Sequence, residues 1–440
     1  MAVRGCLAVV ALAATMFLLS EAGCASGPQK PAANPPAPAT RPAGGITERT
    51  CKAALDWLDR AIASGMVEKM LPAAEAAAER MIAGGTLYAA GNEGFCDELF
   101  YRAGGFPFTE MWQDQQPSKG DVVVIGQYRP DGDDFQWGLA DAKARRETFG
   151  EALIVHFASH NWPAVKSLAA RVAKGPPDAR LYLFDAGTPA GESMEAYCLG
   201  QLATTALAWA FHGEVISAAT RKGKTLATYA SDWEPDGPEW DETVRGHHLH
   251  PTCKVPPIPA GKIGRQYLKI CRRQIAAFAA GQGGQVRLGA GRMAKAMAKG
   301  GRVYILTNGH IHPRGSVIPP GLGRMEMRGR ERFWGWVRND LREGDVLLWM
   351  GYLRYPREPV EQAVMLGAGA VTVSVDAGVN DEQRVHVLSC WKDFDTVIDL
   401  PKYPIRVLPS SGTVQIPQWY SIMAETLAAY KEARSASAGR

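Results

Sequence analysis

Two stretches of the chain, about 216 residues apart, carry the same succession of glycine, strand and loop signals, and this repeat restricts the fold more than any other feature. A glycine pair precedes a short apolar stretch at residues 84–85 and again at residues 300–301, and 300 − 84 is 216. A Gly-Asp step leads into an apolar run at Asp121 and again at Asp345, and 345 − 121 is 224. Matches at nearly one offset predict that a single unit has been duplicated.

A third pair of segments predicts a late strand in each half. Residues 179–185 and 395–399 both read as a late strand that ends in aspartate, and 399 − 185 is 214. A long apolar helical pattern follows each of them, over residues 199–220 and 418–433. The two halves are therefore predicted to share their last strand and last helix as well.

Within each half, apolar strand patterns alternate with helical patterns. The strands lack polar alternation, which is typical of a parallel sheet buried on both faces. We therefore predict two flavodoxin-like α/β sandwiches with parallel sheets, over residues 46–223 and 265–433. Residues 224–264, which are rich in Pro, Gly, His and Trp, are predicted to form an irregular connector, and residues 434–440 a tail.

The first 45 residues are predicted to lie outside the fold. Residues 1–24 combine Arg4 with an apolar run over residues 7–19, which is the pattern of an export signal, and their final Gly-Cys pair resembles a bacterial lipoprotein signal lipidated at Cys24. Residues 25–45 hold six prolines among Ala, Gly and Ser, so we expect a disordered tether. The sequence thus predicts export to the periplasmic side of a bacterial membrane, with membrane contact only through the N-terminal anchor.

Charge and cysteine content narrow the partners. The net charge is only +4 and no basic run stands out, so nucleic acid is not an expected partner. Six cysteines lie beyond Cys24 without a CxxC pair, and six cysteines allow 15 pairings, among which the sequence selects none. No feature calls for a cofactor, and an oligomer is compatible with the sequence.

Residues 77–105 resemble the opening of a sugar isomerase (SIS) domain. The resemblance lies in the glycine pair before the strand, the glycine loop after it and the segment that ends at Gly105. The Gly-Asp steps described above also resemble the lead into the second strand of this family. The tandem repeat is similar to the isomerase part of glucosamine-6-phosphate synthases, which carry two SIS modules. The resemblance covers about residues 50–225 and 265–433.

The family resemblance implies a small-molecule ligand, a phosphosugar-like derivative, at the carboxyl ends of the strands. In the family, hydroxyl side chains of two loops hold the phosphate. Here Phe95 stands where the first loop has a serine, and the loop that begins at Gly126 lacks both serines of the second. We therefore expect a carbohydrate-derivative binding protein that is either a sugar isomerase or a non-catalytic sensing module without phosphate binding.

By their positions in the SIS pattern, the loops and the turn before the last helix supply the candidate ligand-binding residues. Arginines there suit an anionic or hydroxylated ligand, although loop arginines are often only solvated. Hydroxyls just before a helix serve equally well as helix caps. The candidates are Gly91, Asn92, Glu93, Gly94, Arg102, Gln127, Arg129, Asn308, Gly309, Arg314, Arg354, Ser410, Ser411 and Thr413.

Proton transfer in an isomerase needs a group near the sugar that titrates close to neutral pH. Glu98 follows the first loop, and the resemblance makes it a candidate base. An ion pair with Arg102 one helical turn away is the alternative role. His310 and His312 follow the strand over residues 303–306 and are the other catalytic candidates.

A histidine cluster in the connector raises a metal alternative. His248, His250 and Cys253 are residue types that bind zinc. A closed zinc site needs four protein ligands, and the connector has no second matched pair, so no metal is assigned. His310 and His312 also resemble the metal-binding H-x-H of barrel amidohydrolases, and a metal-dependent hydrolase is a further alternative.

Overall fold

The computed structural model describes residues 45–113, 116–128, 149–159, 161, 180–189, 191, 193–231, 234–308, 318–330, 334–351, 354–390 and 395–438. The predicted signal, Cys24 and tether lie outside these residues. Among the residues that are described, no helix combines the length and apolar character that a membrane span needs.

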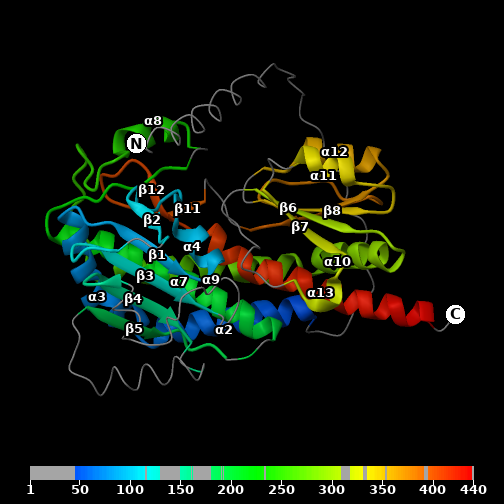
Figure 1. Ribbon diagram of the computed structural model, residues 1–440, viewed down its shortest axis with the longest axis horizontal. Coiled ribbons are helices and arrows are strands. Elements are labelled where there is room, and N and C mark those ends of the chain that lie inside the picture. Colours follow the sequence, from blue (N-terminus) through cyan, green and yellow to red (C-terminus); the bar gives the residue numbers. More distant parts are fainter. Residues whose placement is uncertain are drawn as a thin grey trace. The chain divides into compact units, whose positions relative to one another are not determined.

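The first half forms a five-stranded parallel sheet in the order β2-β1-β3-β4-β5 (Figure 1). Every residue of β3 and β4 is buried, and α7 packs against both of these apolar strands. The strands are β1 (Leu87–Gly91), β2 (Thr109–Met111), β3 (Val122–Gln127), β4 (Leu153–Ala158) and β5 (Leu181–Asp185).

The second half repeats this sheet with the same order, β7-β6-β8-β9-β10. Two parallel sheets with one strand order confirm the prediction of two flavodoxin-like α/β sandwiches. The strands are β6 (Val303–Thr307), β7 (Met325–Arg330), β8 (Val346–Met350), β9 (Gly369–Ser374) and β10 (Arg384–Leu388).

The third segment match was wrong in one respect. The counterpart of β5 is the edge strand β10, whereas residues 395–399 contribute β11 (Thr396–Asp399), which pairs antiparallel with β12 (Arg406–Pro409). As an edge strand, β10 carries Arg384 and His386 and so lacks the apolar run that marks the inner strands. The β11–β12 hairpin is therefore an addition to the repeated unit.

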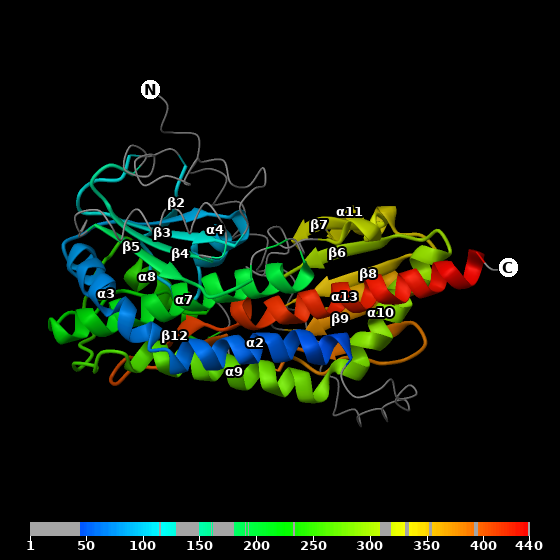
Figure 2. The ribbon, with the colours of Figure 1, turned by 90° about the horizontal axis from the view of Figure 1, so that it is seen from below.

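Helices of both halves pack against one another (Figure 2). The helix α7 follows β5 and α13 follows the hairpin, and both contact α2 and α9. All of α7 between Cys198 and Thr220 is buried, which explains why it is apolar on every side. The helices are α2 (Ile46–Ala63), α3 (Met66–Ile82), α4 (Glu93–Leu99), α7 (Met194–Arg221), α8 (Gly237–Val244), α9 (Lys262–Gly281), α10 (Gly283–Ala298), η3 (Pro320–Leu322), α11 (Trp334–Asp340), α12 (Arg357–Met365) and α13 (Ser411–Ala438).

Glutamates hold the first turns of α2 and α9 in a crossed arrangement. Glu214 of α7 accepts hydrogen bonds from the backbone N–H groups of Gly261 (2.7 Å) and Gly264 (2.8 Å) at the start of α9. Glu425 of α13 accepts from the backbone N–H of Thr47 (3.1 Å) at the start of α2. Each half thus satisfies otherwise unpaired N–H groups of the helix that begins the other half.

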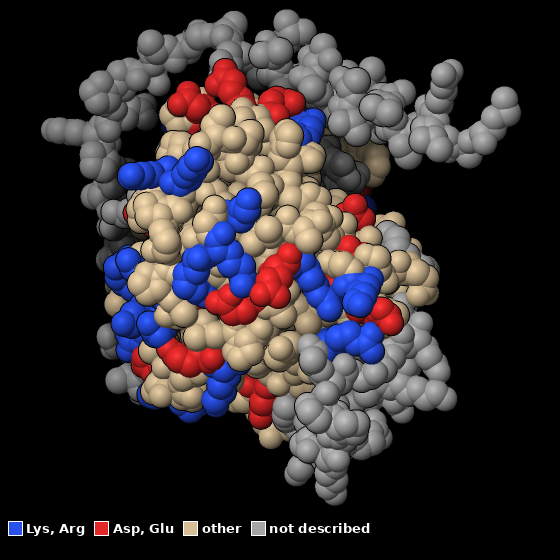
Figure 3. Space-filling view, turned by 90° about the vertical axis from the view of Figure 1, so that its left-hand side faces the viewer, with Lys and Arg blue, Asp and Glu red and all other residues tan. Residues whose placement is uncertain are grey.

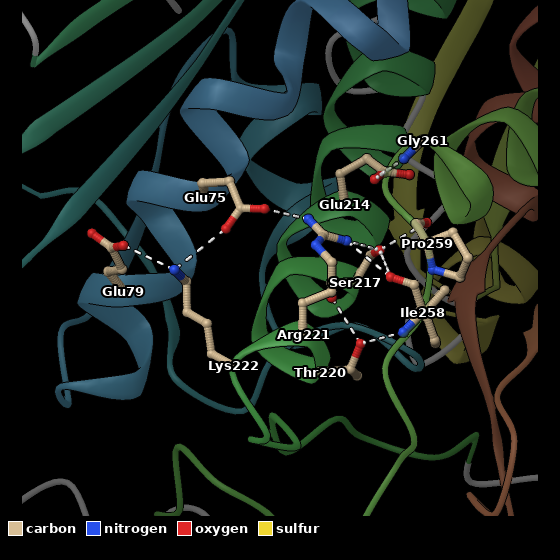
Figure 4. A network of polar contacts seen from close by, with 10 residues as sticks. All are labelled: Glu75, Glu79, Glu214, Ser217, Thr220, Arg221, Lys222, Ile258, Pro259 and Gly261. Atoms are coloured by element: carbon tan, nitrogen blue, oxygen red, sulfur yellow. Dashed lines mark hydrogen bonds and ion pairs between the residues drawn. The ribbon is translucent and has the colours of Figure 1, made fainter.

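The connector is fixed to α7 by side chains of the last helical turns (Figure 4). The guanidinium of Arg221 donates to the carbonyl oxygen of Ile258 (3.0 Å) and also pairs with Glu75 of α3. The hydroxyl of Thr220 accepts from the backbone N–H of Ile258 (3.0 Å).

On the face shown in Figure 3, basic and acidic side chains are interspersed.

Candidate functional site

The structure brings the two loops of the first sheet together at the carboxyl ends of β1 and β3. The backbone N–H of Asn92 donates to the carbonyl of Gly126 (3.0 Å), and the Asn92 side-chain oxygen accepts from the backbone N–H of Tyr128 (2.8 Å). Gly91 has a φ of +109°, and a Cβ there would overlap the carbonyl oxygen of Gly126, so only glycine fits. The predicted ligand residues Gly91, Asn92, Gly94 and Gln127 are therefore neighbours along one sheet edge.

Two aromatic side chains are buried near the points where these two loops begin. The ring of Phe95 lies against Gly126 so closely that a Cβ at Gly126 would overlap it. Tyr128 packs against Gly200 of α7, and both aromatic side chains are buried. The residue that stands in place of the first-loop serine is therefore part of the buried packing between α4 and β3.

A buried ion cluster joins α4 to the start of α13. The guanidinium of Arg102 lies 3.3 Å from the Glu98 carboxylate and 2.9 Å from the Asp395 carboxylate, and all three side chains are at least 95% buried. The indole N–H of Trp209 also donates to Glu98 (3.1 Å). The ion pair proposed from the i,i+4 spacing is thus present, and two distant segments complete it.

Asp395 caps the N-terminus of α13. Its carboxylate accepts hydrogen bonds from the backbone N–H groups of Ser410 (3.2 Å) and Ser411 (2.6 Å) and from the Ser411 hydroxyl (2.8 Å). The guanidinium of Arg102 donates to the Ser411 hydroxyl. Ser411 is therefore bonded within the protein, as is Thr413, whose hydroxyl lies 2.8 Å from that of Tyr267.

Burial gives Glu98 a proton affinity that suits acid–base chemistry. Its pKa is raised from the ordinary value of 4.5 to about 7, mainly by desolvation, while Arg102 lowers the pKa and Asp395 raises it. A Cβ on Gly412 of α13 would overlap the carboxylate, so Glu98 also lies against the helix start. The described groups around Glu98 all belong to the protein. We therefore expect its raised pKa to affect the stability of the fold.

The unfolding free energy should fall as the pH rises from about 4.5 to 7. The folded protein binds the Glu98 proton more tightly than the unfolded chain does, so the folded state is favoured while Glu98 is protonated and loses that advantage above its folded pKa. Glu98→Gln removes this titration and should flatten the decline by about 1–3 kcal/mol. Urea unfolding at several pH values measures the effect.

The effect of Glu98 is measured as the difference in unfolding free energy between the Glu98→Gln variant and the parent protein, because other groups titrate in the same pH range. Burial lowers the pKa of His212 to about 4 and that of His386 to about 4, so their contribution to stability rises with pH between 4 and 6.5. These terms are common to both proteins and cancel in the difference. Parallel pH profiles of the two proteins would contradict the assignment to Glu98.

The carboxyl edge of the second sheet carries a second group of buried polar side chains. The amide NH₂ of Gln415 donates to the carbonyl of Gly351 after β8 (2.7 Å), and that of Gln418 donates to the carbonyl of Ser389 after β10 (2.8 Å). The backbone N–H of Ser389 in turn donates to Ser374, the last residue of β9 (2.9 Å). The first turns of α13 thus span the ends of three neighbouring strands.

Several polar atoms of this group have no hydrogen-bond partner among the described residues. They are the side-chain oxygens of Gln415, Gln418 and Ser389. Each of these residues is at least 97% buried. Sequence reasoning missed the two glutamines, whose only signal is a pair of amides three residues apart on an otherwise apolar helix.

The remaining predicted residues fall into three groups. Arg354 is exposed, and Asn308 lies beside Gly351 at the ends of β6 and β8. The backbone of Glu93 begins α4, but its side chain is not described. The predicted residues outside the described part of the chain are Arg129, Gly309, His310, His312 and Arg314.

The histidine cluster of the connector does not converge. The ring of His248 stacks on Phe108 (4.5 Å), whereas His250 accepts through Nδ1 from the backbone N–H of Cys253 (3.0 Å) and packs on Trp240 (4.6 Å). No group of three or more metal-ligating side chains is found within the described ranges. The metal alternative at His248, His250 and Cys253 is therefore not supported.

Comparison with known proteins gives the fold its name. No family model and no curated protein matches the sequence. Among similar solved structures, the C-terminal domain of glucosamine-fructose-6-phosphate aminotransferase from Francisella tularensis has a TM-score of 0.52 at 10% identity, over 88% of this chain and 95% of that chain. A candidate phosphosugar isomerase from Clostridium difficile 630 has a TM-score of 0.51 at 10% identity, over 88% and 93%. Likeness at this identity concerns the fold alone, and the chain has the tandem sugar isomerase (SIS) fold, one parallel sheet from each half.

Proposed function

We propose that the chain is an exported carbohydrate-binding protein that holds an uncharged part of a sugar derivative at the carboxyl edge of its second sheet. The observation that carries the proposal is the group of buried polar atoms at Gln415, Gln418 and Ser389 that have no hydrogen-bond partner in the described part of the chain. A buried polar atom without a partner costs about 1–3 kcal/mol, so several such atoms in one place indicate a ligand that pairs with them. Ligands of parallel α/β sheets bind at this edge.

The unpartnered atoms favour a neutral ligand rich in hydroxyl groups. Both glutamines donate their NH₂ groups to backbone carbonyls, which leaves their oxygens to accept from the ligand. The hydroxyl of Ser389 can both donate and accept. Sugar hydroxyls match such a mixed set, and none of these side chains carries the positive charge that a phosphate would attract.

A binding or sensing module fits the described residues better than a phosphosugar isomerase. Phe95, which stands in place of the first-loop serine, is packed against Gly126, and the hydroxyl of Ser411 is bonded to Asp395. Glu98 is enclosed by Arg102 and Trp209. The signal-like residues 1–24 and the proline-rich tether support an exported, membrane-anchored protein.

Titration of the purified chain with neutral sugars, amino sugars and sugar phosphates tests the proposal. We expect saturable binding of a neutral or amino sugar. In Gln418→Leu or Gln415→Leu, affinity should fall by about tenfold or more, which corresponds to about 1.4 kcal/mol for a lost hydrogen bond. The unfolding free energy should fall by about 1–3 kcal/mol, because the buried carbonyl that accepted from the glutamine NH₂ is left without that partner.

Gln274→Leu is the matched control. This glutamine lies on α9, which packs against α2 and α7, and it also has a buried side-chain oxygen without a partner among the described residues. Its replacement should leave sugar affinity unchanged. The proposal fails if no sugar binds the parent protein, or if all three leucine variants bind equally well.

A further inference from the structure

The first turn of α13 and the side chain of Arg102 together form a site suited to an anion. Helix N-termini attract negative charge because their first N–H groups point outward without partners. Here the N–H groups of Ser410 and Ser411 and the Ser411 hydroxyl lie within reach of one carboxylate. Arg102 is 99% buried and needs negative charge nearby.

We propose that Asp395 is a built-in anion, whose carboxylate occupies a site that would otherwise bind a phosphate or carboxylate group and so excludes anionic ligands from the start of α13. The four groups that contact it are three hydrogen-bond donors of the helix start and the Arg102 guanidinium at 2.9 Å. These are the kinds of group that proteins use to hold free oxyanions.

The other half of the repeat shows what an ordinary helix start looks like in this chain. There α7 begins after Ser193, whose hydroxyl accepts from the backbone N–H of Ala196 (3.1 Å). That cap is neutral and local. At α13 the cap is a full negative charge from a residue 16 positions upstream.

The backbone at Asp395 indicates that the carboxylate is held in place against a conformational cost. Asp395 has a φ of +75°, in the left-handed region that non-glycine residues seldom adopt. It directly precedes β11, in a hairpin that has no counterpart among the described residues of the first half. Within the same turn, the hydroxyl of Ser410 is fully buried and has no partner among the described residues, which leaves a further donor for an oxyanion.

The inference rests on the proposed function in one respect, the class of ligand that reaches the first turns of α13. If Asp395 takes the anion position, the ligand next to Gln415 is left to pair with neutral groups. A phosphate group would have to displace a buried carboxylate that already has an arginine partner. The exclusion would act through charge repulsion as well as through occupied space.

Chemical rescue tests the inference. In Asp395→Gly the carboxylate is removed and the positive φ is retained without strain. The full-length variant should have a lower melting temperature than the parent protein. Inorganic phosphate or formate should raise that temperature in a saturable way, relative to chloride at equal ionic strength. The parent protein should show no such difference between the salts.

Two further variants make the result specific. Asp395→Asn keeps the shape of the side chain and tolerates the left-handed backbone, so it should lose stability without gaining phosphate rescue. Arg102→Leu in the Asp395→Gly background should abolish the rescue. Because sugar is absent from these measurements, a failure here is distinct from a failure of sugar binding.

Three outcomes would overturn the inference. The first is a folded Asp395→Gly protein that responds to phosphate no more than to chloride. The second is an equal response in the parent protein. The third is a variant that stays unfolded at every phosphate and formate concentration, since a site that accepts an external anion should regain its fold when one is supplied.

Discussion

Replacing Arg102 with leucine should lower the unfolding free energy by about 3–5 kcal/mol. The substitution leaves the carboxylates of Glu98 and Asp395 buried without the cation between them, and breaking a buried ion pair from one side costs about that much. Part of the loss is relieved when Glu98 takes up a proton, which its raised pKa of about 7 favours. Urea unfolding at pH 7 and pH 5 measures the effect, which should be smaller at pH 5.

Arg272→Leu is the matched control for that result. Arg272 donates to Asp59 with two nitrogens, at 2.5 and 2.9 Å, but its side chain is 42% exposed. Exposed pairs contribute only about 0–1 kcal/mol because water screens them. Similar losses for the two variants would show that the Arg102 cluster behaves as a solvated pair, contrary to its burial.

Glu214→Ala should cost about 2–5 kcal/mol. Its carboxylate receives two backbone N–H groups at the start of α9, and each buried donor left without a partner costs about 1–3 kcal/mol. Burial raises the pKa of Glu214, so the charge is held against a desolvation penalty by these hydrogen bonds. Hydrogen exchange at the amides of Gly261 and Gly264, with urea unfolding, reports the loss.

Glu68→Ala gives the reference for Glu214. Glu68 of α3 pairs with Arg265 of α9, but both side chains are at least 40% exposed. We expect a change below about 1 kcal/mol and unchanged exchange at the α9 start. If the two alanine variants are equally stable, the N-terminal contact of Glu214 does not stabilise the fold.

The sheets could be predicted from sequence because their inner strands are uninterrupted apolar runs. Buried β3 and β8 are both preceded by Gly-Asp, and in each case the aspartate side chain accepts backbone N–H groups, for example Asp121 from Thr86 (2.8 Å) and Asp345 from Arg302 (2.8 Å). The repeated motif thus has one structural role in both halves. An edge strand such as β10 has no such constraint and gave no comparable signal.

Only part of the candidate site could be predicted from the sequence. Spacing on one helix indicates the Glu98–Arg102 pair, but nothing local connects them to Ser411, which lies 309 residues further along. Likewise, Gln415 and Gln418 can be recognised as site residues only from their contacts with the strand ends. Contacts of this kind depend on the tertiary packing of segments that lie far apart in the sequence. Periodicity and motif spacing do not indicate that packing.

The crossed glutamates have a consequence for how the two halves depend on each other. Glu214 lies in the first half and serves the helix that opens the second, while Glu425 does the reverse. If one half were separated from the other at the connector, the N–H groups at its first helix would lose their hydrogen bonds to the glutamate. Its own glutamate would also lose its partners. The two halves share a fold, but each depends on the other for a fully hydrogen-bonded helix start.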